Sequence, residues 1–224
     1  MTPYSWGNGN VDAMDVQASE PGLTPRVPAA DAYSRRASEY VEAVGKIEHA
    51  AAEDREFVLE WARGIRGPVL DVGCGPGQWT DFLRKHGADV EGLDPSTAFV
   101  EHARTNYPLS RYRLGRAESL GAPAESLGGV LAWYSLIHTE PSEIDVALAE
   151  FARAVQPGGG LLLGFFAGAR LEAFDHAITT AYYWPADALA ERVERAGFTV
   201  TETQVREGPG KRPEARLCAQ RERW

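Results

Sequence analysis

The sequence predicts a doubly wound α/β fold, in which a mostly parallel sheet ends in an antiparallel hairpin. Short apolar runs alternate along the chain with segments whose apolar residues recur at helical spacing. The first apolar run opens into a glycine-rich turn, as a buried parallel strand followed by a helix does. Near the C-terminus, two segments with alternating polarity flank Gly208-Pro209-Gly210, which indicates a hairpin.

The elements are expected in the following order. Two helices precede the first strand, because residues 33–47 and 57–65 carry apolar side chains at helical spacing. The first strand is Val69–Val72, and right-handed crossovers place it centrally, with its glycine turn at the carboxyl edge of the sheet. There follow a helix over 79–83, a strand over 88–93, a helix over 97–105, a strand over 112–114, an apolar strand over 130–137, a helix after Ser142 that ends at the Pro157–Gly160 run, a strand over 161–166, a helix over 186–196, and hairpin strands over 198–205 and 215–220.

The domain organisation follows from length and composition. A chain of 224 residues suits one α/β domain with a full hydrophobic core. Residues 5–30 are rich in Gly, Pro, Asn, Asp and Ser, so residues 1–30 are expected to be a flexible tail and residues 31–224 the domain.

Composition also limits the partners. No run approaches the roughly 18 apolar residues that span a bilayer, and the first ten residues lack the pattern of a secretory signal, so we expect a cytoplasmic protein without membrane association. A net charge of −9 argues against nucleic-acid binding. Cys74 and Cys218 lack metal-ligand spacing. The expected partner is a small-molecule acceptor, and the protein itself is expected to be a monomer or homodimer.

The glycine turn is the most informative motif. Gly73, Gly75 and Gly77 stand at alternate positions between a strand and a helix, where backbone can approach a ligand closely and offer unpaired N–H groups. A dinucleotide fingerprint requires a third glycine at position 78, which is Gln78, so a nicotinamide-dependent oxidoreductase is disfavoured. Asp71, just before the turn, can hold a cationic amino-acid group.

The second strand ends in an acid. Asp94 occupies the position from which ribose hydroxyls are reached in sheets of this kind. The alternative for the glycines and both acids is a purely structural role in tight turns and helix caps. The combination of motifs in one strand-turn-helix context favours a nucleoside ligand.

With these residues the chain resembles the class I (Rossmann-like) S-adenosylmethionine-dependent methyltransferases, from about Tyr33 to the C-terminus. The resemblance implies a seven-stranded sheet covered by N-terminal lid helices, with the cofactor's methionine part near the glycine turn, its ribose on Asp94 and its adenine near Pro95 and Ser96. Arg116 stands where the family often has an acid, so Glu118 or the Ala117 backbone would face the adenine; the alternative for Glu118 is a solvated loop position. The candidate cofactor-binding residues are Tyr33, Asp71, Gly73, Cys74, Gly75, Gly77, Asp94, Pro95, Ser96, Ala117, Glu118 and Tyr134.

The acceptor is expected beyond the fourth strand. The Asn/Asp-Pro-Pro-aromatic motif of enzymes that methylate base amines or glutamine amides is absent there, and so are the acidic ligands of the magnesium-dependent catechol-type enzymes. His138 is the first candidate for a general base and His176 the second, with helix capping or cofactor contact as the alternative for His138. Tyr40, His138, Phe174, His176 and Tyr183 are candidates for an acceptor pocket, with ordinary core packing as the alternative for the aromatic residues.

The predicted function is metal-independent transfer of a methyl group from S-adenosylmethionine to an oxygen or nitrogen of a small molecule, with S-adenosylhomocysteine as product. A secondary metabolite is one candidate for the acceptor. Two alternatives stay open. One is a protein of the same fold that binds S-adenosylmethionine without transferring methyl, and the other is the NAD-dependent oxidoreductase.

Overall fold

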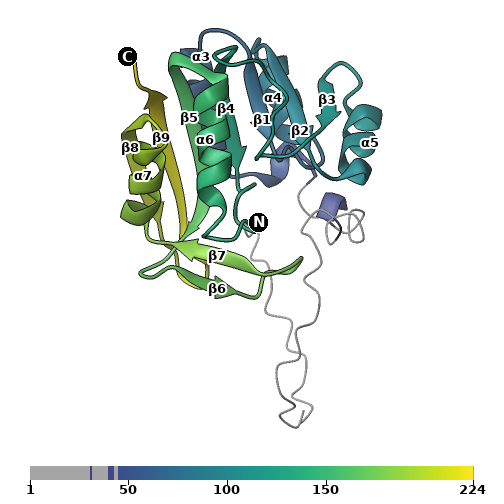
Figure 1. Cartoon of the computed structure of the whole chain (residues 1–224). Helices are drawn as coiled ribbons and strands as arrows, with labels where there is room; N and C mark the ends of the chain where they lie inside the picture. The colour runs from purple at the N-terminus through teal and green to yellow at the C-terminus, as the bar shows by residue number, and fades with distance from the viewer. Residues whose placement is uncertain (1–30, 32–39, 43–44, 224) are drawn as a thin grey trace.

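A computed structural model describes residues 31, 40–42 and 45–223, and within them helices cover both faces of one nine-stranded sheet (Figure 1). The predicted tail and most of the first predicted helix, Tyr33 included, lie outside the described residues. The elements are η1 (Ile47–His49), α3 (Ala52–Gly64), β1 (Val69–Val72), α4 (Gln78–Lys85), β2 (Val90–Asp94), α5 (Thr97–Asn106), β3 (Arg111–Leu114), β4 (Leu127–Trp133), α6 (Ile144–Ala154), β5 (Val155–Ala167), β6 (Glu172–Phe174), β7 (Ala181–Trp184), α7 (Ala186–Arg195), β8 (Phe198–Arg206) and β9 (Glu214–Arg221).

The sheet confirms the predicted architecture. Strands β3, β2, β1, β4 and β5 lie side by side in that order and are parallel, which puts β1 near the centre. Strand β9 runs antiparallel to β5, and β8 runs antiparallel to β9, as expected for the terminal hairpin. These are the seven predicted strands. The further two, β6 and β7, lie in the connection after β5, where the sequence analysis expected no strand.

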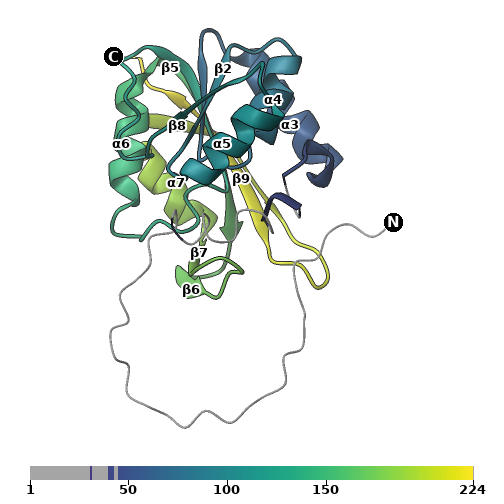
Figure 2. The same cartoon turned by 90° about the vertical axis from the view of Figure 1, so that its right-hand side faces the viewer.

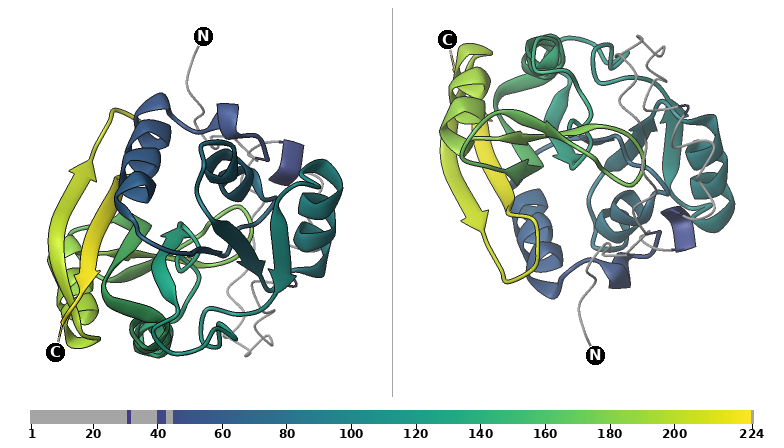
Figure 3. Two further views of the ribbon diagram at one scale, coloured as in Figure 1. Left: turned by 90° about the horizontal axis from the view of Figure 1, so that it is seen from above. Right: turned by 90° about the horizontal axis from the view of Figure 1, so that it is seen from below.

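Two layers of helices cover the sheet (Figure 3). Helices α3, α4 and α5 lie on one face, and α6 and α7 lie on the other. The inner strands are apolar on both faces, as parallel strands between helices are. In β5, Leu162 joins the core beneath α3 and α4, whereas its neighbours Leu161 and Leu163 join the larger core beneath α6 and α7. No helix in the described ranges is both long and apolar enough to cross a membrane.

Two predicted boundaries around the site were wrong. The apolar run 130–137 does not continue as a strand, because β4 ends at Trp133 and Tyr134 takes a φ of 57°, a left-handed conformation that ends extended pairing. The helix before the proline-glycine run ends at Ala154, and the run itself belongs to β5, which begins at Val155. Apolar composition alone does not separate strand from buried loop.

The carboxyl ends of the parallel strands form one edge of the molecule. In Figure 2 the β6–β7 hairpin and the turn between β8 and β9 both lie at the lower edge. Past the end of β4, β7 pairs with β5 through Phe166 and Ala167. The amide of Tyr182 donates to the carbonyl of Ile137 in the loop after β4 (2.9 Å). The sheet thus collects the glycine turn, this loop and both hairpins around one edge.

Candidate active site

The glycine turn has a left-handed backbone at all three glycines, with φ of 70° at Gly73, 53° at Gly75 and 92° at Gly77. A side chain at Gly73 or Gly77 would collide with the protein, since its Cβ would lie 2.2 Å from the Cβ of Ser135 or 2.7 Å from that of Ala103. A Cβ at Gly75 would meet nothing within 4 Å. Gly75 therefore borders open space at the sheet edge, whereas Gly73 and Gly77 are required by packing.

Asp94 is attached to this turn. Its 6 % exposed carboxylate accepts hydrogen bonds from the amide of Gly75 (2.9 Å) and the amide of Ser96 (2.8 Å). Burial raises the pKa of Asp94 to about 6, although both hydrogen bonds oppose the shift. Each carboxylate oxygen has a second lone pair, so the same group can also accept hydroxyl donors. Ser96 is the N-cap of α5, and Pro95 beside it is exposed.

Asp71 and Cys74 at the glycine turn are both buried. The Asp71 carboxylate is 2 % exposed and accepts a hydrogen bond from the Thr80 hydroxyl (2.6 Å), which connects β1 to the first turns of α4. Burial raises the pKa of Asp71 to about 7, with the Asp94 carboxylate contributing. The Cys74 side chain packs with Ala103 and Tyr112, and burial raises the pKa of its thiol well above the usual value. Ligand contact by either side chain stays a prediction.

Ser135 is a residue that the sequence analysis missed. It follows Tyr134 in the loop after β4, and its side chain packs against Gly73. Its hydroxyl oxygen is buried and has no hydrogen-bond partner in the described part of the chain. A buried hydroxyl is normally hydrogen-bonded, so Ser135 is a candidate for contact with a ligand at the glycine turn. Serine is common in loops, and only the contact with Gly73 distinguishes it.

Tyr40 and Glu118 lie at different places around the glycine turn. Tyr40, expected in the acceptor pocket, packs its ring against Phe99 at the start of α5 (5.4 Å between centroids). Burial raises its pKa to about 12, with the Asp94 carboxylate adding to the shift, so Tyr40 lies on the Asp94 side of the site. Glu118 pairs with Arg116 (3.1 Å) in the loop after β3, next to Ala117.

The side chains of His138 and His176, the two candidates for a general base, lie side by side. Their rings are 5.1 Å apart, although the two residues are 38 positions apart in the sequence. His138 Nδ1 lies 2.7 Å from the Thr180 carbonyl, which only accepts, so Nδ1 carries the proton and Nε2 is the basic nitrogen of the neutral ring. The His176 Nδ1 instead accepts from the Ile178 amide (3.4 Å), which leaves its proton on Nε2.

Burial lowers the pKa of both histidines. For His138 burial outweighs the opposing hydrogen bond to Thr180. For His176 burial, followed by the nearby His138 and Arg212, lowers the pKa to about 4. Both rings are therefore neutral at pH 7, which is the protonation state that a general base requires.

A row of aromatic rings joins the glycine-turn side of the sheet to the histidine pair. Tyr134 contacts Trp133 (5.5 Å) and Phe166 (5.3 Å), and Phe166 contacts Phe174 (5.4 Å). Phe174 stacks on Tyr183 across the β6–β7 hairpin (4.1 Å). We call Trp133, Tyr134, Phe166, Phe174 and Tyr183 the aromatic row. It brings together Phe174, His176, Tyr183 and His138, but among the described contacts not Tyr40.

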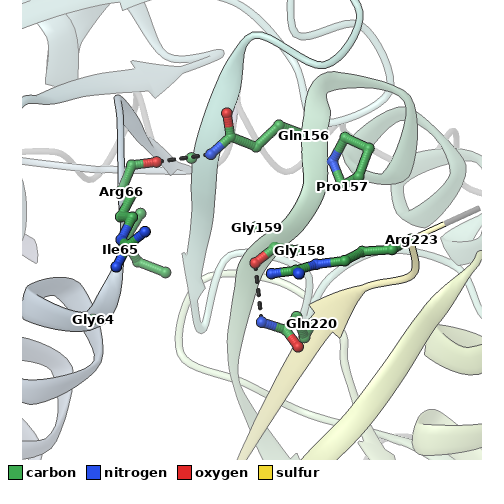
Figure 4. Close-up of a pocket in the computed structure, with 10 residues that line it drawn as sticks. Gly64, Ile65, Arg66, Gln156, Pro157, Gly158, Gly159, Gln220 and Arg223 are labelled. Atoms are coloured by element: carbon green, nitrogen blue, oxygen red, sulfur yellow. Dashed lines mark hydrogen bonds between the residues drawn. The ribbon is translucent and has the colours of Figure 1, made fainter.

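A hollow of about 370 Å³ lies at the edge of the sheet opposite the glycine turn (Figure 4). Figure 4 shows Gln156 hydrogen-bonded to the Arg66 carbonyl, and Gln220 to the Gly158 carbonyl beside Arg223. These residues lie near the amino ends of β1 and β5, far from the glycine turn. The described residues include no group of three or more His, Cys, Asp or Glu that could hold a metal ion.

Comparison with known proteins shows which proteins this chain resembles. Residues 69–159 match a family model described as a methyltransferase domain, and this segment runs from β1 to the glycines of β5. Over this segment the chain is similar to methyltransferase domains, and its fold is that of the class I methyltransferases. Its relatives include a malonyl-[acyl-carrier protein] O-methyltransferase of Salmonella typhimurium, which is 34 % identical over 58 % of this chain and 50 % of the relative. A protein of the same name in Erwinia billingiae is 26 % identical over 80 % of this chain and 72 % of the relative.

Solved structures share this methyltransferase fold. A 1,6-didemethyltoxoflavin-N1-methyltransferase of Burkholderia thailandensis, with its substrate and S-adenosylhomocysteine bound, has a TM-score of 0.68 at 19 % identity and covers 91 % of this chain and 94 % of its own. The [4+2]-cyclase SpnF has a TM-score of 0.71 at 21 % identity over 86 % of this chain and 94 % of its own. The chain spans about half the length of the first curated relatives it matches.

Proposed function

We propose that the protein transfers a methyl group from S-adenosylmethionine to an oxygen or nitrogen of a small-molecule acceptor. The observation that carries the proposal is the open space at Gly75 beside the Asp94 carboxylate, in a turn whose Gly73 packs against Ser135 with its buried, unpartnered hydroxyl. The family match and the bound S-adenosylhomocysteine in a neighbour of the same fold support this choice of cofactor. Metal independence and a cytoplasmic location stay predictions.

The residues at the turn suit S-adenosylmethionine better than a dinucleotide. Two buried carboxylates, Asp71 and Asp94, stand at or beneath the turn, and they would repel a pyrophosphate but favour a ligand with an ammonium and a sulfonium. Asp94 would hold the ribose hydroxyls, and the Ser135 hydroxyl would bind the amino-acid part. Tyr40 and Phe99 would cover the nucleoside. When bound, the cofactor supplies a methyl group that is already activated by its positively charged sulfur.

The acceptor end supplies alignment and a base. The aromatic row offers flat apolar surface that excludes water and holds a planar acceptor, and alignment of the reacting atoms provides much of the rate in a displacement reaction. His138 Nε2 would take the proton of a hydroxyl or amine acceptor. His176, with its proton on Nε2, would donate a hydrogen bond to the acceptor or to its neighbour.

The acceptor could be free or attached to a carrier protein. Several relatives are named for an acyl-carrier protein substrate, whereas the Burkholderia neighbour is named for a small heterocycle. We favour a free small molecule, because the formal charge of −9 favours association with neither acidic proteins nor nucleic acids.

A protein that binds the cofactor without transferring methyl is the second candidate. The specific observation in its favour is that one neighbour of the same fold is named as a [4+2]-cyclase. A class I fold therefore does not by itself imply methyl transfer.

Two measurements test the proposal. Calorimetry with S-adenosylmethionine, S-adenosylhomocysteine and NAD should show binding of the first two only, and Asp94→Ala should weaken both by roughly tenfold or more. Transfer of labelled methyl to a panel of phenols, amines and carboxylic acids, run with and without EDTA, should identify an acceptor whose methylation survives EDTA. Binding of NAD alone would contradict the proposed cofactor, and cofactor binding without any transfer would favour the second candidate.

A further inference from the structure

A hollow of about 470 Å³ lies between the first turns of α3 and the β8–β9 hairpin. Its walls include Phe57 of α3, Trp133 and Tyr134 at the end of β4, and Arg206, Glu214 and Arg216 of the hairpin. We call it the α3 pocket. Because Trp133 and Tyr134 begin the aromatic row, the pocket adjoins the proposed acceptor site and lies at the same edge of the sheet.

One of the two arginines in the α3 pocket is fully neutralised. The Arg206 guanidinium donates to both oxygens of Asp54 (3.0 Å each) and to Glu214 (2.7 Å), and it lies 3.5 Å from Glu53. These carboxylates raise its pKa further above the usual value for arginine. Arg206 is thus committed to joining α3 to the hairpin.

The other arginine, Arg216, has no such partner. Its guanidinium stacks on the Phe57 ring, 3.4 Å from the ring centroid, and its Nε is buried without a hydrogen-bond acceptor in the described residues. It forms no ion pair with any carboxylate that the structure describes. A buried charged donor without an acceptor is costly. The side chain as a whole is only partly buried and lines the pocket, so the outer N–H groups of the guanidinium are the ones that can meet a ligand.

The carboxylates around the α3 pocket pair with Arg206 or lie at the rim, and none forms an ion pair with Arg216 in the described residues. Asp54 and Glu214 share the single positive charge of Arg206, to which both are hydrogen-bonded. Glu53 and Glu60 at the rim are each 80 % exposed, where water screens their repulsion, and Glu56 is also exposed. The acids that line the pocket outnumber its two arginines, so recognition of an anion here depends on direct hydrogen bonds from Arg216 and not on the net charge of the lining.

The sheet register connects Arg216 to the proposed reaction centre. Trp133 of β4 lies opposite Gly164 of β5, which in turn lies opposite Arg216 of β9. Neighbouring strands are about 4.8 Å apart, so Arg216 and Trp133 are separated by roughly 10 Å across the sheet. Gly164 has no side chain to block this path, and the rings of Trp133 and Tyr134 lie against it. A molecule of a few carbon atoms can span the distance.

We propose that Arg216 binds a carboxylate of the acceptor, so that the protein is selective for acidic small molecules. A planar guanidinium offers two parallel N–H donors that match both oxygens of a carboxylate. The stack on Phe57 holds the guanidinium plane in place, which lowers the entropy cost of binding. This inference rests on the proposed function, because it treats the α3 pocket as part of the acceptor site.

The test compares a planar acid with its neutral amide. Binding of trans-cinnamate and cinnamamide is measured by calorimetry on the full chain saturated with S-adenosylhomocysteine. Wild type should bind the acid about tenfold to a hundredfold more tightly than the amide, the value of a charged hydrogen-bonded contact. Arg216→Gln should abolish this preference. Arg216→Lys keeps the positive charge but lacks the two parallel N–H donors of the guanidinium, so it should retain only part of the preference.

Matched controls separate this site from general charge and from loss of fold. Arg195→Gln removes an exposed arginine of α7 and should leave the preference unchanged. Thermal unfolding of each variant checks the fold, and Phe57→Leu, which removes the stack but keeps the charge, should weaken acid binding by a smaller factor than Arg216→Gln. Equal affinity of acid and amide in wild type, no binding of the acid at millimolar concentration, or an intact preference in folded Arg216→Gln would overturn the proposal.

Titration with S-adenosylhomocysteine alone distinguishes the two failures. Cofactor binding without an acid preference overturns the role of Arg216 but leaves the proposed function standing. An acid preference that depends on Arg216, measured on protein that does not bind the cofactor, supports the carboxylate site and contradicts the proposed function.

Discussion

The three glycines of the turn are required for different physical reasons. All three have left-handed backbones, but only Gly75 faces open space. Sequence spacing identified the turn and its strand-helix context. It could not show that Gly77 is held by Ala103 and Tyr112, because those residues come from α5 and β3, more than twenty positions away.

This difference predicts opposite outcomes for two alanine substitutions. Gly75→Ala should cost about 1–2 kcal/mol of stability through backbone strain, yet weaken S-adenosylhomocysteine by tenfold or more, since the methyl group enters the ligand's space. Gly77→Ala should cost roughly 2–5 kcal/mol, because strain adds to a collision with Ala103 and Tyr112. Urea unfolding and calorimetry on both variants measure the two effects. Equal loss of stability in the two variants would contradict the assignment.

The histidine pair makes a prediction about pH. Because burial lowers the pKa of His138 and His176, both stay neutral as the pH falls below 6.5, where an unperturbed histidine would begin to protonate. The acidic limb of kcat should therefore lie below pH 6.5. His138→Gln should lower kcat by about 10²-fold to 10⁴-fold with a hydroxyl or amine acceptor, and cofactor affinity should stay unchanged.

The control for this profile is His86→Gln, an exposed histidine at the end of α4, which should keep the wild-type pH dependence. Wild-type kcat in His138→Gln across pH 5–9 would rule out the base.

His138, His176 and Tyr40 show how far the site could be predicted from the sequence. His138 and His176 were predicted separately, and the fold brings their rings together through the connection after β5. Tyr40 was assigned to the acceptor, but its ring lies against Phe99 and near Asp94. Helical spacing told which face of its segment was apolar, and it could not tell over which loop that face would pack.

At the scale of elements, strands and helices with strong periodicity were predicted to within a few residues. Helix α7 and strands β8 and β9 differ from the expected bounds by one residue at most at each end. The exceptions lie where apolar composition and backbone conformation disagree. The run after Trp133 is apolar, yet Tyr134 turns the chain, and β6 and β7 are short strands whose partners are β5 and each other.

A side-chain hydrogen bond of Tyr182 joins the β6–β7 hairpin to the loop after β4, in addition to the contacts of His138. The Tyr182 hydroxyl donates to the Glu140 carboxylate (2.6 Å), beside the backbone bond from Tyr182 to Ile137. Tyr182→Phe removes a hydrogen bond to a charged acceptor, which should cost about 1.5–3 kcal/mol of local stability. We expect faster amide hydrogen exchange in residues 172–184 and a higher KM for the acceptor.

The β8–β9 hairpin provides the control in the same experiment. Its amides should exchange at the wild-type rate, because Tyr182 pairs with β6 and not with β9. Uniformly faster exchange throughout the sheet would indicate global destabilisation instead.

At the scale of the whole molecule, the α3 pocket exists because the two ends of the domain meet. Asp54 lies in the first turn of α3, and Arg206 ends β8, 152 residues later. Their bidentate contact, together with Glu214, holds the helix before β1 against the terminal hairpin. Neither residue was singled out in the sequence, since an isolated acid and an isolated arginine carry no signal until the topology pairs them.

Breaking this contact should destabilise the domain and open the α3 pocket. Asp54 is only 9 % exposed, so Arg206→Ala leaves a nearly buried carboxylate without its cation, at a cost of about 2–4 kcal/mol after allowance for the partial exposure of Arg206. The double variant Asp54→Ala with Arg206→Ala should recover part of this loss, because no unpaired charge remains. Urea unfolding of the two single variants, the double variant and the surface control Arg195→Ala completes the cycle. Strictly additive losses would show that the contact does not couple α3 to the hairpin, whereas a coupling of 1 kcal/mol or more would show that Asp54 and Arg206 join α3 to the terminal hairpin in the folded protein.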